Sequence, residues 1–341
     1  MKYQKIFLSA IIAILLVISG CREVTVTTIV HPNGTFTRII TVTGDSTDVF
    51  KRDLPFPVDD TWTMESAKDT ADSTKYVVTY TKLFRNSKQL NREIAADTGI
   101  NSTLTRNIDI RKRFGFFYSY LSFRETFKSM NQFTYLNYKD YLTDEDIQWF
   151  TSMRIPVTGP DSTKKDEAEE KVESFLIKSA TAEIEAILKN GIEQLHDPQL
   201  DPNQVDDYQD SIYAFIQSWS FDSTSDILSE YQRWTGNEAV SKLRSLTPPL
   251  FEEFYKKASQ VDAILELEPY TEVVELPGLI TATNSSMLNG NEVRWDFTGN
   301  SVMLTDYKIF VESRVVNYWA FVVSGVVLLL LVILLIIKAF R

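Results

Sequence analysis

Residues 318–337 read YWAFVVSGVVLLLLVILLII, twenty residues without a charge, and Lys338 and Arg341 follow them. At about 1.5 Å per helical residue, this stretch spans roughly 30 Å, which is the thickness of the hydrocarbon core of a bilayer. A buried helix of a water-soluble domain is seldom this long or apolar on every face. The stretch therefore predicts a C-terminal transmembrane helix over 318–337, followed by a short cytoplasmic tail over 338–341.

The N-terminal residues have the pattern of a secretion signal. Residues 2–18 combine two lysines with an apolar run. The tetrad Ile-Ser-Gly-Cys that ends at Cys21 resembles the bacterial lipobox, whose cysteine thiol accepts a diacylglyceryl group and whose mature protein carries acyl chains such as palmitate. Cys21 is also the only cysteine of the chain. We predict a lipoprotein signal peptide over 1–20 and lipidation at Cys21; the alternative is an N-terminal membrane helix with an incidental cysteine.

The two ends constrain each other. If Cys21 is acylated at the outer leaflet, residues 22–317 lie outside the cytoplasm, and the last helix crosses inward. This orientation leaves Lys338 and Arg341 in the cytoplasm, in agreement with the positive-inside rule. Proteins that span the outer membrane are barrels, so a helical anchor favours the inner membrane. We therefore predict a single-pass, lipid-anchored protein of the bacterial inner membrane, with its ectodomain on the periplasmic or outer side.

Charge and cysteine content restrict the partners. The chain carries a formal charge of −11, which becomes −15 once Lys2, Lys5, Lys338 and Arg341 are removed. An acidic body is repelled by nucleic acid, so we expect no nucleic-acid partner. With Cys21 lipidated, no disulfide can form, and stability must come from an apolar core. The lipid bilayer is the first partner that the sequence predicts.

Alternating patterns at both ends of the ectodomain predict strands. Residues 23–43 alternate apolar side chains with Thr or Arg on either side of Asn33-Gly34, which favours a tight hairpin. Further alternating stretches lie at 75–84, 104–112 and 114–127, and again after Pro269, where Asn289-Gly290 favours a second hairpin turn. These stretches predict a mostly antiparallel sheet that combines N-terminal and C-terminal strands.

Between the strands the apolar period changes to that of helices. Residues 166–195 form one long amphipathic pattern. Its apolar stripe consists of Val172, Leu176, Ala180, Ile184, Leu188, Ile192 and Leu195. Shorter helical patterns follow up to residue 265, and none of them is apolar on all sides. They predict a helical layer inserted between two β halves.

Together these patterns predict an α+β fold, with a mostly antiparallel sheet, an inserted helical layer and one C-terminal transmembrane helix. The predicted parts are a signal peptide over 1–20, an N-terminal β part over 21–140, a helical insertion over 141–265, a C-terminal β part over 266–317, the transmembrane helix over 318–337 and the tail over 338–341.

Three features together resemble a known family: the lipobox followed by an Asn-Gly hairpin, the late segment LPGLITATN…NGNEVRWDF, and the closing apolar helix. The chain is similar to the LppM-like bacterial lipoproteins. The matching late residues are Pro277, Gly278, Thr283, Asn284, Gly290, Asn291 and Trp295. The aromatic stretch with Glu125 and the following YLTDED also resemble uncharacterised lipoproteins of the Bacteroidetes. The resemblance implies an envelope protein with a lipid-binding role and implies no catalytic residue.

Motifs for enzyme chemistry are not found in the sequence. The chain has two histidines, His31 and His196, with no paired His or Cys spacing of the kind that binds transition metals. It contains no Gly-x-Ser-x-Gly, no phosphate-binding Gly-rich loop and no dinucleotide fingerprint. We therefore expect no catalytic residue, no metal and no cofactor. Acidic clusters at the predicted helix starts are explained by capping and by the helix dipole.

One group of neighbouring residues has the mixture of basic and aromatic side chains that is typical of a contact surface. It comprises Arg111, Lys112, Arg113, Phe114, Phe116, Phe117, Tyr118 and Tyr120. Basic side chains can meet lipid phosphates, while aromatic side chains sit at a membrane interface or line an apolar groove. The alternative is a central strand whose aromatic side chains fill the core behind a charged turn. The sequence leaves both interpretations open.

Three functions are consistent with these features. The first is a non-enzymatic, membrane-tethered envelope lipoprotein that binds a lipid, another apolar ligand or an envelope protein near the membrane surface. The second is a scaffold or assembly factor of a membrane protein complex, which would use an acidic helical face. The third is a hydrolase, and it would need two carboxylates that converge in a cleft with raised pKa values.

Overall fold

The computed structural model of the chain describes residues 22–51, 54, 56–97, 104–132, 135–151, 160–218, 226–265 and 267–340. The signal peptide expected over 1–20 and the lipidation expected at Cys21 lie outside these residues. Within them the chain is α+β, which confirms the predicted fold class. It divides into two compact units. The β unit contains the described residues up to Lys128, Glu268–Phe297 and the residues from Tyr307 onward, and the helical unit contains Ser129–Leu267 and Thr298–Asp306.

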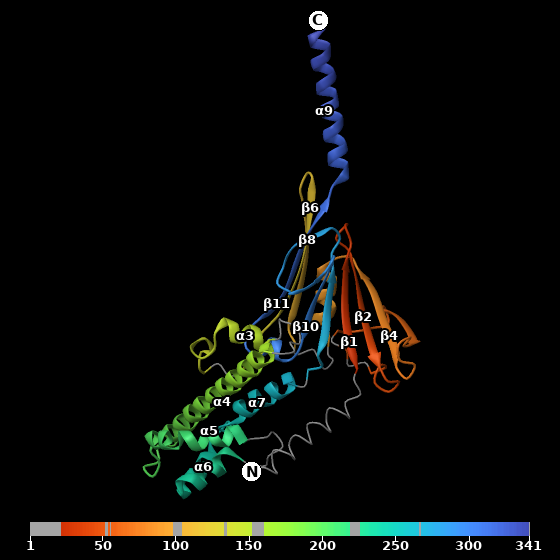
Figure 1. Cartoon of the computed structure of the whole chain (residues 1–341). Coiled ribbons are helices and arrows are strands. Elements are labelled where there is room, and N and C mark those ends of the chain that lie inside the picture. The colour runs from red at the N-terminus through yellow and green to blue at the C-terminus, as the bar shows by residue number, and fades with distance from the viewer. Residues whose placement is uncertain are drawn as a thin grey trace. The chain divides into compact units, whose positions relative to one another are not determined.

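The larger sheet of the β unit has seven strands in the order β3-β4-β2-β1-β7-β10-β9. Their bounds are β1 Glu23–Val30, β2 Phe36–Gly44, β3 Thr63–Lys68, β4 Tyr76–Phe84, β7 Tyr270–Glu275, β9 Met287–Asn289 and β10 Glu292–Phe297. The central pair β1 and β7 is parallel, and the other neighbours are antiparallel. Figure 1 shows β1, β2 and β4 as neighbouring strands. The sheet thus joins strands that precede the helical elements in the sequence with strands that follow them, as predicted.

Glycines in the positive-φ region form both predicted hairpin turns. Gly34 between β1 and β2 has φ of 90°, and Gly290 between β9 and β10 has φ of 64°. A residue with a Cβ would be strained in this region, which explains the Asn-Gly sequence at each turn.

A second sheet of four strands completes the β unit. Its order is β5-β6-β11-β8, with β5 Arg106–Phe114, β6 Tyr118–Phe127, β8 Leu279–Thr283 and β11 Tyr307–Val316. The sequence patterns predicted one sheet, whereas the structure has two. The reason is that each sheet has one apolar face to bury, as Val26, Ile40 and Val78 do in the larger sheet and Leu121, Phe123 and Val311 do in the smaller one. Phe127 of β6 meets Phe297 of β10 with ring centroids 4.6 Å apart, so these faces pack together.

Helix α2 (Ser87–Ala95) protects the edge of β5. Asn86 caps its first turn by accepting a hydrogen bond from the Gln89 amide. The Asn91 side chain pairs with the outward backbone of Ile108, accepting from its amide at 2.9 Å and donating to its carbonyl at 2.7 Å. The amide side chain thereby replaces a neighbouring strand at this position.

The helical unit is built on α4 (Pro160–Leu195), the long helix that the apolar stripe predicted. The other elements are η2 Tyr138–Asp140, α3 Asp144–Phe150, η3 Pro202–Tyr208, α5 Gln209–Ser218, α6 Ile227–Thr235, η4 Glu238–Ser245, α7 Glu252–Leu265 and α8 Asn300–Met303. Val172, Ala180, Ile184, Leu188 and Ile192 of the predicted stripe are buried. The side chains of Leu176 and Leu195 are partly buried against the same core.

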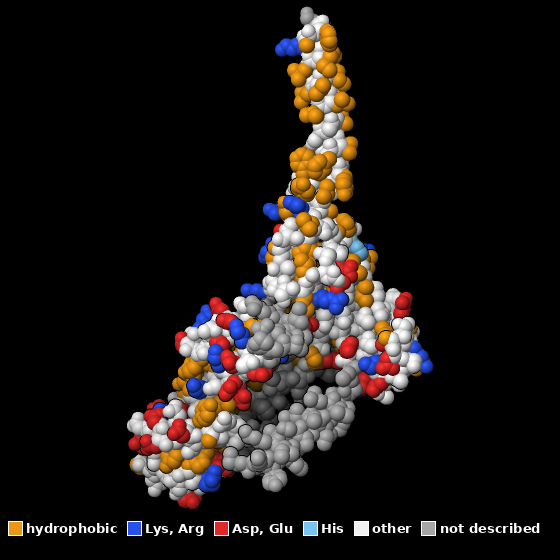
Figure 2. Space-filling view, viewed as in Figure 1, with side chains coloured by type: hydrophobic (Ala, Val, Ile, Leu, Met, Phe, Trp, Pro, Cys, Tyr) orange, Lys and Arg blue, Asp and Glu red, His pale blue; other side chains and the backbone are white. Residues whose placement is uncertain are grey.

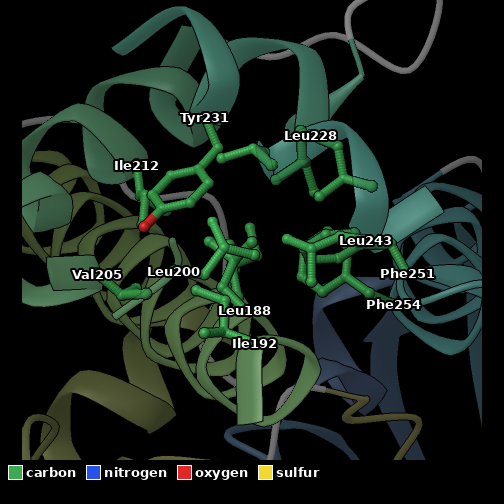
Figure 3. Close-up of a cluster of buried hydrophobic side chains, with 14 of the residues drawn as sticks. Leu188, Ile192, Leu200, Val205, Ile212, Leu228, Tyr231, Leu243, Phe251 and Phe254 are labelled. Atoms are coloured by element: carbon green, nitrogen blue, oxygen red, sulfur yellow. The ribbon is translucent and has the colours of Figure 1, made fainter. Parts of the chain in front are cut away.

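Side chains from six elements form the core of this unit. Leu188 and Ile192 of α4 lie at its centre, surrounded by Val205, Ile212, Leu228, Tyr231, Leu243 and Phe254 (Figure 3). Isolated helices as short as α5 and α6 are only marginally stable in water, so packing on α4 stabilises them.

Leu188→Ala should destabilise the helical unit by about 2–5 kcal/mol, because Leu188 is fully buried and its truncation leaves a cavity. The matched control is Gln194→Ala on the exposed face of α4. Urea unfolding of the full chain in detergent micelles measures both variants. Equal unfolding midpoints for the two variants would contradict this account of the core.

The last strand continues into helix α9, Tyr318–Ala339. Its best window has a mean hydropathy of 3.4, and 6% of that window is buried. Among the described residues it is the helix that is long and apolar enough to cross a membrane. Figure 1 shows α9 continuing from the end of β11. It covers the predicted span of 318–337 and is therefore a candidate membrane anchor.

Candidate functional site

The β5–β6 hairpin carries the residues that the sequence singled out. Its strands pair from Arg106 with Phe127 to Phe114 with Ser119, and residues 115–117 form the turn. A Cβ on Gly115 would lie 2.6 Å from the Tyr118 carbonyl oxygen, so this tight turn requires glycine.

The hairpin turn is hydrogen-bonded to the residue that precedes α9. The backbone N–H of Asn317 donates to the Phe117 carbonyl at 2.9 Å. The side-chain Nδ2 of Asn317 donates to the carbonyls of Gly115 at 2.7 Å and Phe116 at 3.2 Å. Its Oδ1 accepts from the Ser119 hydroxyl at 3.1 Å. The Asn317 side chain therefore binds the hairpin and does not cap its own helix. This arrangement fixes the turn beside the first residues of α9.

Aromatic side chains gather at this junction. We call Phe114, Phe116, Phe117, Trp319 and Phe321 the helix-base cluster. Phe114 stacks on Trp319 with ring centroids 6.1 Å apart, Phe116 meets Trp319 edge-on at 5.3 Å, and Phe117 meets Phe321 at 5.0 Å. The three phenylalanines remain 65%, 48% and 40% exposed. Full burial of one such side chain contributes about 1.5–3 kcal/mol, so leaving about half of each ring in contact with water is unfavourable.

The two interpretations of the aromatic stretch apply to different parts of it. The turn residues Phe116 and Phe117 are exposed, whereas Phe123 and Phe127, farther along β6, are buried in the core. Tyr118 is half-buried and faces away from the other sheet, because the alternating neighbours of β6 are the ones that are buried. The core interpretation therefore fits the second half of the stretch, and the surface interpretation fits the turn.

The basic residues of β5 are exposed and have different neighbours. Arg111 forms an ion pair with Asp109 at 2.6 Å, and Lys112 donates to the Pro32 carbonyl at 2.7 Å. The Arg113 guanidinium lies over the Tyr120 ring at 4.6 Å. Figure 2 shows basic side chains close to the start of the apolar surface of α9.

Sequence reasoning missed one residue of this surface. Arg314 of β11 lies over the Tyr118 ring at 4.7 Å. It is distant in the sequence from β5, and only the pairing of β11 with β6 brings it here. The alternation of 307–316 could have placed it on the outer face, but no sequence signal gives the register.

A buried charge cluster lies between the two sheets, and the sequence did not predict it. It consists of Thr28, Arg38, Arg106, Glu125 and Glu272. Arg38 forms ion pairs with Glu272 at 3.1 Å and with Glu125 at 3.6 Å. The Thr28 hydroxyl accepts from Arg38 and donates to Glu272. The cluster crosses the interface, because Arg38 and Glu272 belong to the larger sheet and Glu125 belongs to the smaller one.

One aromatic ring packs against both arginines of the cluster. The guanidinium carbons of Arg38 and Arg106 lie 3.8 and 3.5 Å from the centroid of the Phe56 ring. Burial lowers the pKa of Arg106, and burial raises the pKa of Glu272 to about 8 despite the attraction of Arg38. Since Arg38, Glu125 and Glu272 have no exposure to solvent, the cluster is positioned to hold the sheets together and is closed to a substrate.

Asn284 is hydrogen-bonded to Trp295, another residue of the late segment, and to the backbone of β11. Its Oδ1 accepts from the Trp295 indole at 3.2 Å and from the Phe310 amide at 2.9 Å, and its Nδ2 donates to the Lys308 carbonyl. Trp295 is 2% exposed and belongs to the core. The Asn284 side chain therefore joins β10 of the larger sheet to β11 of the smaller one.

A surface hollow of about 240 Å³ in the β unit contains two neighbouring carboxylates, Asp59 and Asp60. Asp59 accepts hydrogen bonds from the amide and hydroxyl of Thr61, and the hydroxyl bond contributes most to lowering the Asp59 pKa. An acid catalyst needs the opposite shift. In the described ranges, no group of three or more His, Cys, Asp or Glu side chains is arranged to hold a metal ion.

Comparisons with known proteins add one distant likeness. No family model matches the chain, and no curated protein matches it. Among solved structures, the chain is similar to the folded domain of the LppM protein of Mycobacterium tuberculosis, determined by NMR. The identity is 8%, the TM-score is 0.29, and the likeness covers 87% of this chain and 92% of that chain. At this TM-score the likeness carries no argument about function.

Arg38→Met should cost about 3–5 kcal/mol of the free energy of unfolding, because it removes the buried cation that is ion-paired with Glu125 and Glu272 and leaves only Arg106 near them. Adding Glu272→Met to this variant should recover part of the loss, since a buried acidic group that has lost its partner is then removed. Urea unfolding of the full chain in detergent measures this double-mutant cycle. Simple addition of the two single losses would contradict coupling within the cluster.

The raised pKa of Glu272 predicts a pH dependence of stability. Its ordinary value is 4.5 and its folded-state value is about 8, so its contribution to stability is complete below pH 4.5. That contribution decreases as the pH rises through about 8, because the folded state resists ionisation. The urea midpoint of the wild type, measured relative to that of Glu272→Gln, should therefore fall as the pH is raised from 4.5 to about 8. The exposed Glu65→Gln is the control, and a pH-independent difference between wild type and Glu272→Gln would contradict the prediction.

Proposed function

We propose that this chain is a non-enzymatic, membrane-tethered lipoprotein of the bacterial inner membrane, and that its β unit rests on the bilayer through the helix-base cluster. In this proposal Cys21 carries the acyl anchor, α9 spans the membrane, and the ectodomain lies on the periplasmic or outer side. The observation that carries the proposal is the junction of the hairpin turn with the start of α9 through Asn317.

The composition of the junction supports this placement. Trp and Tyr are enriched where a membrane helix meets the headgroups, and Tyr318 and Trp319 stand at that position in α9. The three exposed phenylalanines of the hairpin lie at the same level as these residues, because they contact Trp319 and Phe321. Their transfer into the interfacial region removes the unfavourable contact with water.

The β unit is connected to α9 in two ways, through β11 and through the hydrogen bonds of Asn317 to the hairpin turn, and these connections fix its orientation. A helix that leaves a domain through a flexible linker lets the domain tumble, whereas β11 runs into α9 through Asn317, which is bonded to the hairpin. The sheet is therefore held at a defined angle to α9. A ligand or partner near the membrane surface would meet one constant face of the sheet.

A fluorophore at the hairpin turn tests the proposal. Phe117→Cys, in a Cys21→Ser background, is labelled with an environment-sensitive dye in the full chain and reconstituted into vesicles that contain quencher lipids. The label should be strongly quenched by quenchers placed just below the headgroups. The control label at Arg124→Cys lies roughly 23 Å farther along the hairpin and should remain unquenched. Equal quenching at both positions, or none at 117, would overturn the proposed placement.

A further inference from the structure

Two arginines and a tyrosine lie in one row across three strands of the smaller sheet. Tyr120 of β6 is paired with Arg113 of β5 on one side and with Arg314 of β11 on the other. Neighbouring strands are about 4.8 Å apart, so the two arginine Cα atoms are roughly 10 Å apart. The row faces outward, because Ser119 and Leu121 on either side of Tyr120 are buried.

Both guanidinium groups are held on tyrosine rings. Arg113 lies over Tyr120 at 4.6 Å, and Arg314 lies over Tyr118 at 4.7 Å. Tyr118 and Tyr120 are on the same face of β6 and form the floor of this site. Stacking orients a guanidinium while leaving the N–H groups at its edge available for a planar or tetrahedral oxyanion.

The charges of these two arginines are not neutralised by the protein. Among the described residues, neither Arg113 nor Arg314 has a carboxylate within ion-pair distance, whereas Arg111 is paired with Asp109. Glu312 lies on the same face of β11 and accepts a hydrogen bond from Thr281. The site therefore has two free cationic groups on a body whose formal charge is strongly negative.

The position of the row along the sheet indicates which anion it meets. Val316, the next outward residue of β11, is paired with Tyr118 and is followed by Asn317 and α9. Long basic side chains extend toward the polar side of a membrane interface while their stems remain on apolar surface. Arg113 and Arg314 thus stand between the helix-base cluster and the rest of the ectodomain, at the level where lipid phosphates would lie.

We propose that Arg113 and Arg314 form a binding site for the phosphate of an anionic phospholipid headgroup. This inference rests on the proposed placement of the hairpin turn at the bilayer. The two guanidinium groups bind the phosphate oxygens through charge-assisted hydrogen bonds, and the hydroxyl groups of the two tyrosines are available to the headgroup beyond the phosphate. The site also offsets the repulsion between an acidic ectodomain and an anionic membrane surface.

Native mass spectrometry of the full chain in detergent micelles tests the site. The wild type is titrated with phosphatidylglycerol and, separately, with phosphatidylcholine of the same acyl chains. Arg113→Gln/Arg314→Gln should weaken phosphatidylglycerol binding by about tenfold or more, because a hydrogen bond to a charged group contributes about 1.5–3 kcal/mol. Arg124→Gln/Lys308→Gln removes the same charge from the same face, farther from α9, and should change binding by less than about twofold.

A second pair of variants separates charge from geometry. Arg113→Lys/Arg314→Lys keeps both charges but loses the two-pronged hydrogen bonding, so its affinity should fall between those of the wild type and the glutamine variant. The variants change side chains that are exposed or, at Arg314, half-buried, and unchanged thermal unfolding confirms that they fold.

Three outcomes would overturn the inference. The first is equal weakening by the site variant and the control variant, which would indicate general charge attraction. The second is no weakening by either. The third is displacement of phosphatidylglycerol by millimolar inorganic phosphate with comparable affinity, which would assign the site to free phosphate. The fluorophore at position 117 distinguishes these failures from failure of the proposed function, because quenching there does not depend on the two arginines.

Discussion

The pairing of β11 with β6 is the interaction on which the rest of the β unit depends. It runs without a break from Tyr307 opposite Phe127 to Val316 opposite Tyr118. Because β6 comes from the N-terminal part and β11 from the C-terminal part, this pairing closes the smaller sheet across the inserted helical unit. A shift of β11 by one residue would turn Val311 and the other core-facing side chains of β11 outward and would separate Arg314 from the row of Tyr120. The same register places Asn317 beside the hairpin turn.

The buried charge cluster adds specificity to an interface that is otherwise apolar. Apolar faces of two sheets can pack at several offsets with similar energies, whereas a desolvated Arg38 is tolerated only where Glu125 and Glu272 meet it. The cluster therefore favours one alignment of the sheets. In this interpretation it maintains the geometry of the outer face, where the arginine row lies, from the opposite side of the same sheet.

Much of the fold could be predicted from local sequence patterns. The hairpin turns at Asn33-Gly34 and Asn289-Gly290, the stripe on α4 and the apolar length of α9 each follow from a period or a turn preference within one short stretch. The division into two sheets could not be predicted in this way. Alternation shows that a strand such as 118–127 has one buried face, but it does not show which other strand covers that face.

At the candidate site, too, some features followed from the sequence and others only from the tertiary structure. The sequence by itself determined that Arg111 to Tyr120 combine basic and aromatic side chains, and that a long apolar helix ends the chain. Only the tertiary structure decided that Phe116 and Phe117 are exposed while Phe123 is buried, that the hairpin turn meets the start of α9, and that Arg314 joins Arg113. The physical reason is that burial and pairing depend on contacts between distant segments, and sequence periodicity reports only the conformation of a single segment.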